Sequence, residues 1–282
     1  MEILRLDGLC KQYPAFRLDN VSFSMEAGTI MGLIGRNGAG KTTTLKSMLH
    51  LVHPDAGKIT ICGLDMDTDE RAIRSRIGFV SGGASYYQRK RLRELTDVTK
   101  DFYPGWDGER YARLVRQFSL DERKRVCELS EGMKVKYQLA VAMSHKAELL
   151  ILDEPTAGVD PRERIRIRGF IAGLARERIV LLATHVVTDV ECIADRVLLM
   201  NKGKLLKADR PENLIASIQT KAAEKLCTPE EIERYQQQYG FGSLFQRQEG
   251  QVLRLIGDEL PAEFAPVESG LSLEEVYLYY CT

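Results

Sequence analysis

The chain has 282 residues, enough for one large domain or two modest ones. Its 40 basic and 40 acidic residues balance, which argues against nucleic acid or an anionic membrane as the main partner. Its apolar runs are too short to span a bilayer, its amino terminus lacks the apolar core of a signal peptide, and its six scattered cysteines indicate reduced thiols in a cytosolic protein.

Residues 1–28 alternate in the manner of strands, with a break at Pro14. An apolar run at residues 29–34 predicts a further strand, and residues 43–49 predict a helix. Between them lies Gly35-Arg36-Asn37-Gly38-Ala39-Gly40-Lys41-Thr42, which fits the phosphate-binding loop pattern of two glycines separated by four residues, then Lys and Thr.

This loop is predicted to hold a nucleoside triphosphate, because its glycines let backbone N–H groups curl around phosphate oxygens at the positive end of the following helix. Lys41 would reach the β- and γ-phosphates, and the Thr42 hydroxyl would bind Mg²⁺. A Gly-rich turn that merely precedes Lys-Thr is the alternative. The expected nucleotide contacts come from Gly35, Asn37, Gly38, Ala39, Gly40, Lys41, Thr42 and Thr43.

Two short strands are predicted next, at residues 58–62 and 76–80. The pattern then becomes helical and charged, so that a helical insertion is expected at about residues 84–146. Beyond about residue 211 the composition changes again. Residues 211–282 are therefore predicted to form a small α+β appendage.

A second acidic site follows the helical insertion. The apolar strand predicted at residues 149–152 ends in Asp153-Glu154, and a second strand at 179–184 follows a charged helix at 161–178. This is a parallel βαβ arrangement, which places terminal acids at the carboxyl edge of the sheet, where ligands bind. Asp153 would hold Mg²⁺, and Glu154 would polarise the attacking water. A solvated acidic pair at a strand end is the alternative.

Leu129-Ser130-Glu131-Gly132-Met133 lies between these two sites, and Thr184-His185 ends the later strand. This order of motifs resembles the ATP-binding-cassette (ABC) transporter ATPases, in particular bacterial drug and peptide exporter cassettes, over residues 1 to about 208. The resemblance implies an α/β P-loop NTPase with a mixed sheet, an antiparallel β subdomain and a helical insertion, to which the composition adds the small C-terminal α+β appendage. The expected domains are an ABC ATPase domain at 1–210 and a C-terminal accessory region at 211–282.

The same resemblance implies further roles for single residues. Tyr13 would stack on adenine, with ordinary packing as its alternative. Ser130 and Gly132 would complete the γ-phosphate shell of the opposite subunit, although a plain Ser cap explains Ser130 as well. Asp160 would touch the partner subunit. His185 would contact the γ-phosphate and act with Glu154 and Lys41 in catalysis; a lone structural histidine is the alternative.

Because the chain carries one copy of each motif, the resemblance implies a homodimer or a paired ABC subunit. It further implies ATP and Mg²⁺ as cofactors, and an integral membrane permease that the protein serves from the cytoplasm, peripheral on the inner face of the cell membrane. A soluble ABC protein that acts in regulation or ATP sensing is the alternative. A cassette protein acting on DNA or the ribosome would need coiled coils or two cassettes, which the sequence does not show.

The chain departs from the family pattern at a few positions. Gly82 stands where most members carry a glutamine, and Glu131 and Met133 replace the usual Gly and Gln of the signature, so a working but slow ATPase is expected. Residues 101–107 resemble a segment of exporter cassettes, with packing as the alternative. A permease-docking rim, or else a solvated basic face, is expected at Tyr86, Tyr87, Arg89, Lys90, Arg91 and Arg93.

Overall fold

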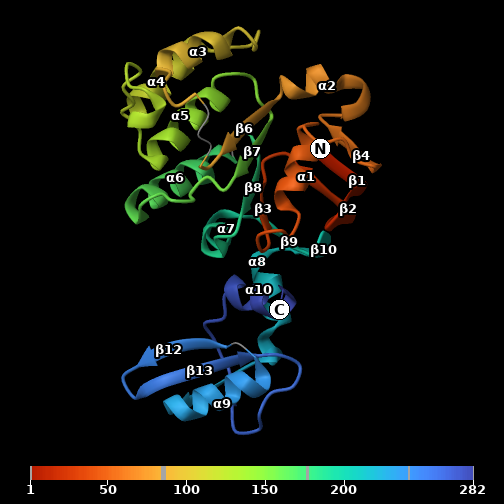
Figure 1. The fold of residues 1–282 in the computed structure, drawn as a ribbon, viewed down its shortest axis with the longest axis vertical. Coiled ribbons are helices and arrows are strands. Elements are labelled where there is room, and N and C mark those ends of the chain that lie inside the picture. Colours follow the sequence, from red (N-terminus) through yellow and green to blue (C-terminus); the bar gives the residue numbers. More distant parts are fainter. Residues whose placement is uncertain (1, 84–86, 176–177, 241, 282) are drawn as a thin grey trace. The chain divides into compact units, whose positions relative to one another are not determined.

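The computed structural model describes residues 2–83, 87–175, 178–240 and 242–281, drawn as a ribbon in Figure 1. The chain divides into two compact units, Met1–Ala208 and Asp209–Thr282. The functions assigned above to residues 1–210 and 211–282 remain predictions.

A six-stranded sheet forms the centre of the first unit, in the order β10-β9-β3-β8-β7-β6. The pairs β3–β8, β3–β9, β7–β8 and β6–β7 are parallel. Strands β3 and β8 are buried along their whole length, because helices and the second sheet cover both faces. The strands are β3 (Ile30–Ile34), β6 (Ile77–Ser81), β7 (Leu149–Asp153), β8 (Ile179–Thr184), β9 (Arg196–Asn201) and β10 (Lys204–Asp209).

A four-stranded sheet in the order β2-β1-β4-β5 packs beside it. Its β1–β2, β1–β4 and β4–β5 pairs are antiparallel, and the predicted break at Pro14 is the turn between the first two strands. Helix α1 (Lys41–Met48) contributes Leu45 and Met48 to the core that both sheets share. The strands are β1 (Glu2–Tyr13), β2 (Phe16–Glu26), β4 (Ala56–Ile61) and β5 (Leu64–Asp65).

Helices form the remainder of the first unit. Figure 1 shows α3, α4 and α5 at one end of this unit and α1 with the antiparallel sheet at the other. The sequence did not predict α2 (Met66–Arg74) or α7 (Val187–Ile193), since one is dominated by charged residues and the other is short and rich in valine and threonine. The other helices are α3 (Leu92–Lys100), α4 (Gly108–Gln117), a 3₁₀ turn (Val126–Glu128), α5 (Glu131–Met143) and α6 (Pro161–Leu174).

The segment at residues 101–107 packs the helical part. The ring of Tyr103 stacks on His145 with centroids 4.0 Å apart, and Trp106 lies 5.3 Å from Tyr111. The side chain of Asp107 caps α4 by accepting a hydrogen bond from the Arg110 N–H at 2.8 Å. Packing therefore accounts for Tyr103 and Trp106, whereas the side chain of Phe102 is exposed.

The second unit combines a sheet in the order β12-β13-β11-β14 with helices, as the α+β prediction requires. Helix α9 covers one face through Ile232 and Tyr235. On β13, the buried Arg254 pairs with Glu224 at 2.9 Å and with Glu275 of α10 at 3.3 Å. The elements are α8 (Pro211–Ser217), a 3₁₀ turn (Gln219–Lys221), β11 (Ala222–Cys227), α9 (Pro229–Tyr239), β12 (Ser243–Arg247), β13 (Gly250–Ile256), β14 (Ala265–Pro266) and α10 (Leu273–Cys281).

Candidate functional site

The glycine-rich loop wraps the start of α1, directly after the buried strand β3. Gly40 caps this helix at φ +112°, a conformation that favours glycine, and Gly38 lies at φ +82°. Within the described chain no side chain caps α1, so the N–H groups of its first turn face the loop with the positive end of the helix dipole. The loop thus offers backbone donors and a positive field to an anion.

Lys41 brings a buried positive charge into this loop. Its ammonium donates to the carbonyl of Gly35 at 2.6 Å and lies 3.9 Å from Oε1 of Glu154. Burial lowers the pKa of Lys41, while the charges of Glu154 and Asp153 oppose this shift. A buried cation held by a carbonyl and two nearby carboxylates suits an incoming phosphate, whose negative charge would stabilise it.

The carboxylate of Glu154 is held from two directions at the carboxyl end of the sheet. Oε2 accepts a hydrogen bond from the Thr184 hydroxyl at 2.9 Å, and Oε1 accepts one from the His185 N–H at 2.9 Å. Nδ1 of His185 also lies 2.9 Å from Oε2. Glu154 itself has φ +51°, an uncommon conformation for a residue with a side chain, and such strain gathers at functional sites.

Asp153 supplies the carboxylate that fits a cation. Its Oδ1 is buried and has no hydrogen-bond partner among the described residues. Burial raises the pKa of Asp153, as does the charge of Glu154, while Lys41 and Lys46 lower it. An unpaired, buried carboxylate oxygen beside a phosphate-type loop matches a hard divalent cation such as Mg²⁺, and the exposed Thr42 follows Lys41 at the helix start. Among the described residues, no cluster of three His, Cys, Asp or Glu forms an independent metal site.

The strands β3, β7 and β8 run parallel, so their carboxyl ends lie side by side. The structure therefore brings together, at these strand ends, the loop residues, Lys41, Asp153, Glu154 and His185. Ser130 and Gly132 lie elsewhere, at the start of α5 in the helical end of the unit (Figure 1). The Ser130 side chain caps that helix by accepting from the Met133 N–H at 3.3 Å. Within one chain, the residues expected to surround a nucleotide therefore lie at two separate places, the phosphate loop and the start of α5.

Asp160 caps α6, where its side chain accepts a hydrogen bond from the Glu163 N–H at 3.1 Å. Val159, just before it, borders Gly132, so that this loop and the start of α5 lie together. Tyr13 ends β1, half-buried, with its ring 6.3 Å from that of Phe16. Phe16 borders Gly40 in the loop and was not predicted from the sequence, although an aromatic residue at the start of a strand beside Tyr13 is a usable signal.

Gly82 and Gln138 lie at the end of β6, next to the acidic pair. The Gly82 N–H donates to the Asp153 carbonyl at 2.7 Å. The amide of Gln138, which sequence reasoning missed, bonds to the backbone of Ser81. No sequence signal marks Gln138, because it lies in the middle of a helix, 57 residues from its partner.

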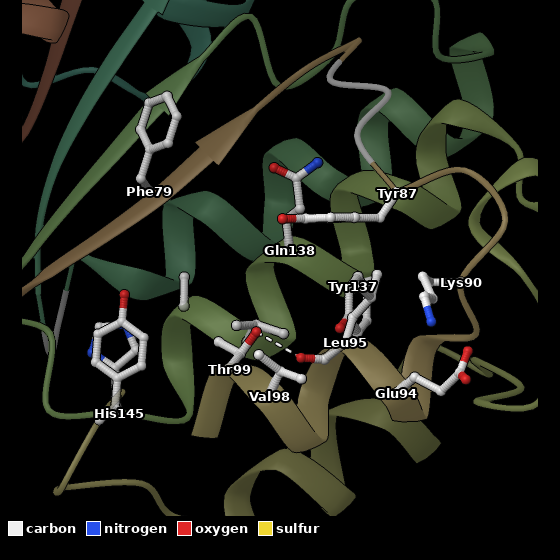
Figure 2. Close-up of a pocket in the computed structure, with 13 residues that line it drawn as sticks. Phe79, Tyr87, Lys90, Glu94, Leu95, Val98, Thr99, Tyr137, Gln138 and His145 are labelled. Carbon is white, nitrogen blue, oxygen red and sulfur yellow. Dashed lines mark hydrogen bonds between the residues drawn. The ribbon is translucent and has the colours of Figure 1, made fainter. Parts of the chain in front are cut away.

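A cavity of about 570 Å³ opens between β6 and the helical part, with Phe79 on one wall and Val98 and Thr99 on another (Figure 2). Phe79, Tyr87 and Val98 are exposed there, and Lys90 stands at the rim. Tyr86 lies outside the described residues. Arg89, Arg91 and Arg93 of the expected rim are exposed.

None of the described helices is both long and apolar enough to cross a membrane.

Comparison with known proteins places these features in a family. The family model described as ABC transporter matches residues 18–157. Nod factor export ATP-binding protein I of Burkholderia lata is 37% identical over 210 residues, 71% of this chain and 68% of the relative. Bacitracin transport ATP-binding protein BcrA of Bacillus licheniformis is 32% identical over 210 residues, 73% of this chain and 69% of the relative.

Solved structures agree with this. A structure described as the ATP binding subunit of an ABC transporter superposes with a TM-score of 0.69 at 26% identity, over 76% of this chain and 92% of that one. A dimeric ATP-binding cassette in a post-hydrolysis state with ADP and Pi superposes with a TM-score of 0.63 at 22% identity, over 74% of this chain and 98% of that one, a likeness in fold.

Proposed function

Since the chain belongs to the ABC transporter ATPases, the family of the exporter-type relatives above, we propose that it hydrolyses ATP as a paired cassette and thereby powers a separate membrane permease. The observation that carries this proposal is the carboxylate of Glu154, fixed by Thr184 and His185 at the mouth of the phosphate loop and 3.9 Å from Lys41.

In the proposed complex, the loop at residues 35–43 binds the phosphates of ATP, and Lys41 exchanges its contact with the Gly35 carbonyl for phosphate oxygens. Tyr13 stacks on the adenine. Thr42 and Asp153 hold Mg²⁺, which supplies charge neutralisation at the phosphates.

Glu154 is proposed to orient the attacking water and take its proton. Two hydrogen bonds fix its carboxylate, so little orientational freedom is lost when the water binds. Nδ1 of His185 lies against the same carboxylate, which leaves Nε2 to contact the γ-phosphate. Lys41 stabilises the negative charge that the phosphates carry during the reaction.

The site is proposed to be completed by a second cassette, either a second copy or a paired ABC subunit. Ser130 and Gly132 lie at the start of α5, away from α1 of their own chain (Figure 1), so they would serve the nucleotide of the partner, and Asp160 would lie at the same interface. Hydrolysis removes the γ-phosphate that joins the two halves and lets them part.

The cavity of Figure 2 is the proposed contact with the permease. Its exposed Phe79, Tyr87 and Val98 offer apolar surface to a short helix of that subunit, and Lys90 offers a charge at the rim. Docking there would hold the protein at the inner, cytoplasmic face of the cell membrane. An ATP-sensing protein that serves no permease is the competing function.

ATP turnover and permease capture test this proposal together. The purified protein should hydrolyse ATP only with Mg²⁺, Lys41→Ala should abolish the turnover, and a multispan membrane protein should co-purify with the parent chain from its own membranes. Val98→Asp, on the cavity wall, should break that capture and leave turnover by the isolated chain unchanged. Absence of Mg²⁺-dependent turnover above the Lys41→Ala background would reject the ATPase assignment, and turnover without any captured membrane protein would favour the ATP-sensing function.

A further inference from the structure

Gln138 makes a two-point contact with the last residue of β6. The Ser81 N–H donates to Oε1 of Gln138 at 2.8 Å, and Nε2 of Gln138 donates to the Ser81 carbonyl at 3.1 Å. Strand β6 is an edge strand of the six-stranded sheet, so these backbone groups face away from β7. The buried amide of Gln138 therefore satisfies a donor and an acceptor that the sheet leaves open.

The residue after Ser81 is packed directly onto the acidic pair. The Gly82 N–H donates to the Asp153 carbonyl at 2.7 Å. A Cβ on Gly82 would lie 1.8 Å from the carbonyl oxygen of Glu154, so the two backbones are in close contact. The end of β6 is thus held between Gln138 on one side and the backbone of Asp153 and Glu154 on the other.

Gln138 also belongs to two other features of the fold. It lies on α5, eight positions after Ser130, which begins that helix. It also lines the cavity of Figure 2, where it stands with Tyr87 and Phe79. A shift of α5 must therefore either break the hydrogen bonds between Gln138 and Ser81 or move the end of β6 together with the helix.

We propose that Gln138 is a positioning residue that couples the helix bearing Ser130 to the backbone of Asp153 and Glu154 through Ser81 and Gly82. This proposal rests on the ATPase function proposed above. Gln138 does not touch the substrate. It fixes the position of the end of β6, which packs against the strained backbone of Glu154. Its loss should therefore lower turnover while substrate binding at the phosphate loop is kept.

Gln138→Leu removes both hydrogen bonds at nearly equal size, and it should lower kcat at least tenfold while KM for ATP changes less than about threefold. The matched control is Gln237→Leu, the same change at an exposed position of α9 in the second unit, which should keep both constants. A kcat for Gln138→Leu within twofold of the control would overturn the inference.

Gln138→Glu separates positioning from a general loss of structure. Only the protonated carboxyl can donate to the Ser81 carbonyl as the amide does, and burial beside that carbonyl favours the protonated form. The kcat of Gln138→Glu relative to the parent should therefore rise at least threefold from pH 8 to pH 6. A ratio that is flat with pH would overturn the inference, including when Gln138→Leu fails to fold.

The failures of the two proposals differ. A parent chain with no turnover above the Lys41→Ala background rejects the ATPase function, and the inference falls with it. A parent chain that turns over ATP, while both Gln138 variants match it at every pH, rejects the inference alone.

Discussion

The carbonyl oxygen of Glu154 occupies the space into which any side chain on Gly82 would extend: a Cβ there would lie 1.8 Å away. The family resemblance leads us to expect glutamine where this chain has Gly82. The backbone conformation of Glu154, at φ +51°, brings its carbonyl onto this position and leaves no room for a side chain there.

Placing glutamine at position 82, as the family resemblance leads us to expect, should therefore lower the rate of ATP turnover. Gly82→Gln should lower the kcat for ATP at least tenfold, because the new Cβ displaces the backbone of Glu154 and with it the carboxylate that Thr184 and His185 hold. Gly108→Ala is the control, since a Cβ at that position meets no atom within 4 Å. Steady-state kinetics check this, and a Gly82→Gln variant faster than the parent would show that the displaced backbone is harmless.

Asp153→Asn should separate stability from activity. The raised pKa of Asp153 means that the folded protein disfavours its charged form, so a neutral side chain of the same shape should raise the melting temperature of the metal-free protein by a few degrees. The same change should raise the Mg²⁺ concentration for half-maximal turnover more than tenfold. Thermal unfolding in EDTA and a Mg²⁺ titration of turnover check the two parts; an unchanged Mg²⁺ requirement would remove Asp153 from the metal site.

The stability of the first unit should depend on pH through His145. Burial, helped by the charge of Arg178, lowers the pKa of His145 from 6.5 to about 4, although a hydrogen bond with the backbone of Ser75 opposes this. Between those values the unfolded chain binds a proton that the folded chain does not, so stability falls as pH falls through this range and is fully present above about 6.5.

His145→Phe tests this, since a phenyl ring keeps a stacking surface for Tyr103 and cannot take up a proton. When the pH is lowered from 7 to 5.5, the melting temperature of the parent should fall by several degrees and that of the variant by less. Equal drops in the two proteins would assign the pH dependence to other groups.

The buried ion cluster of the second unit should be sensitive to the loss of one partner. Arg254→Met leaves Glu224 and the buried Glu275 without their shared cation, which should cost about 3–5 kcal/mol of unfolding free energy. Lys221→Met, which removes a solvent-exposed pair with Asp258, should leave the unfolding free energy nearly unchanged. Hydrogen exchange of the β11 and β13 amides under increasing urea measures both, and equal costs would mean that Arg254 is better solvated than its burial indicates.

Much of the fold followed from the sequence, because its apolar strands and the phosphate loop are local patterns. The strand at residues 179–184 has the predicted bounds, whereas α1 begins at Lys41, two residues before the predicted start. Helix α2 escaped prediction because it is short and only Met66 and Ile73, one helical repeat of seven residues apart, mark its buried face; its formation depends on burying them against other elements.

The candidate site was predictable where chain order alone places the residues. Asp153 and Glu154 end a buried parallel strand, so their arrival beside Lys41 follows from topology. The positive φ of Glu154, the contact of its carbonyl with Gly82 and the pairing of Gln138 with Ser81 depend on tertiary distances of ångström precision, which no spacing in the sequence encodes.

The proposed hydrolysis depends above all on Glu154, and turnover by Glu154→Gln measures the role of this residue most directly. The amide keeps the size of the side chain and can still accept the hydrogen bond of the His185 N–H, but it cannot take a proton from water. Glu154→Gln should bind ATP as tightly as the parent, hydrolyse it at least a hundredfold more slowly, and accumulate with ATP as a dimer in size-exclusion chromatography. Hydrolysis at the parental rate would contradict the proposed role of Glu154 as the base.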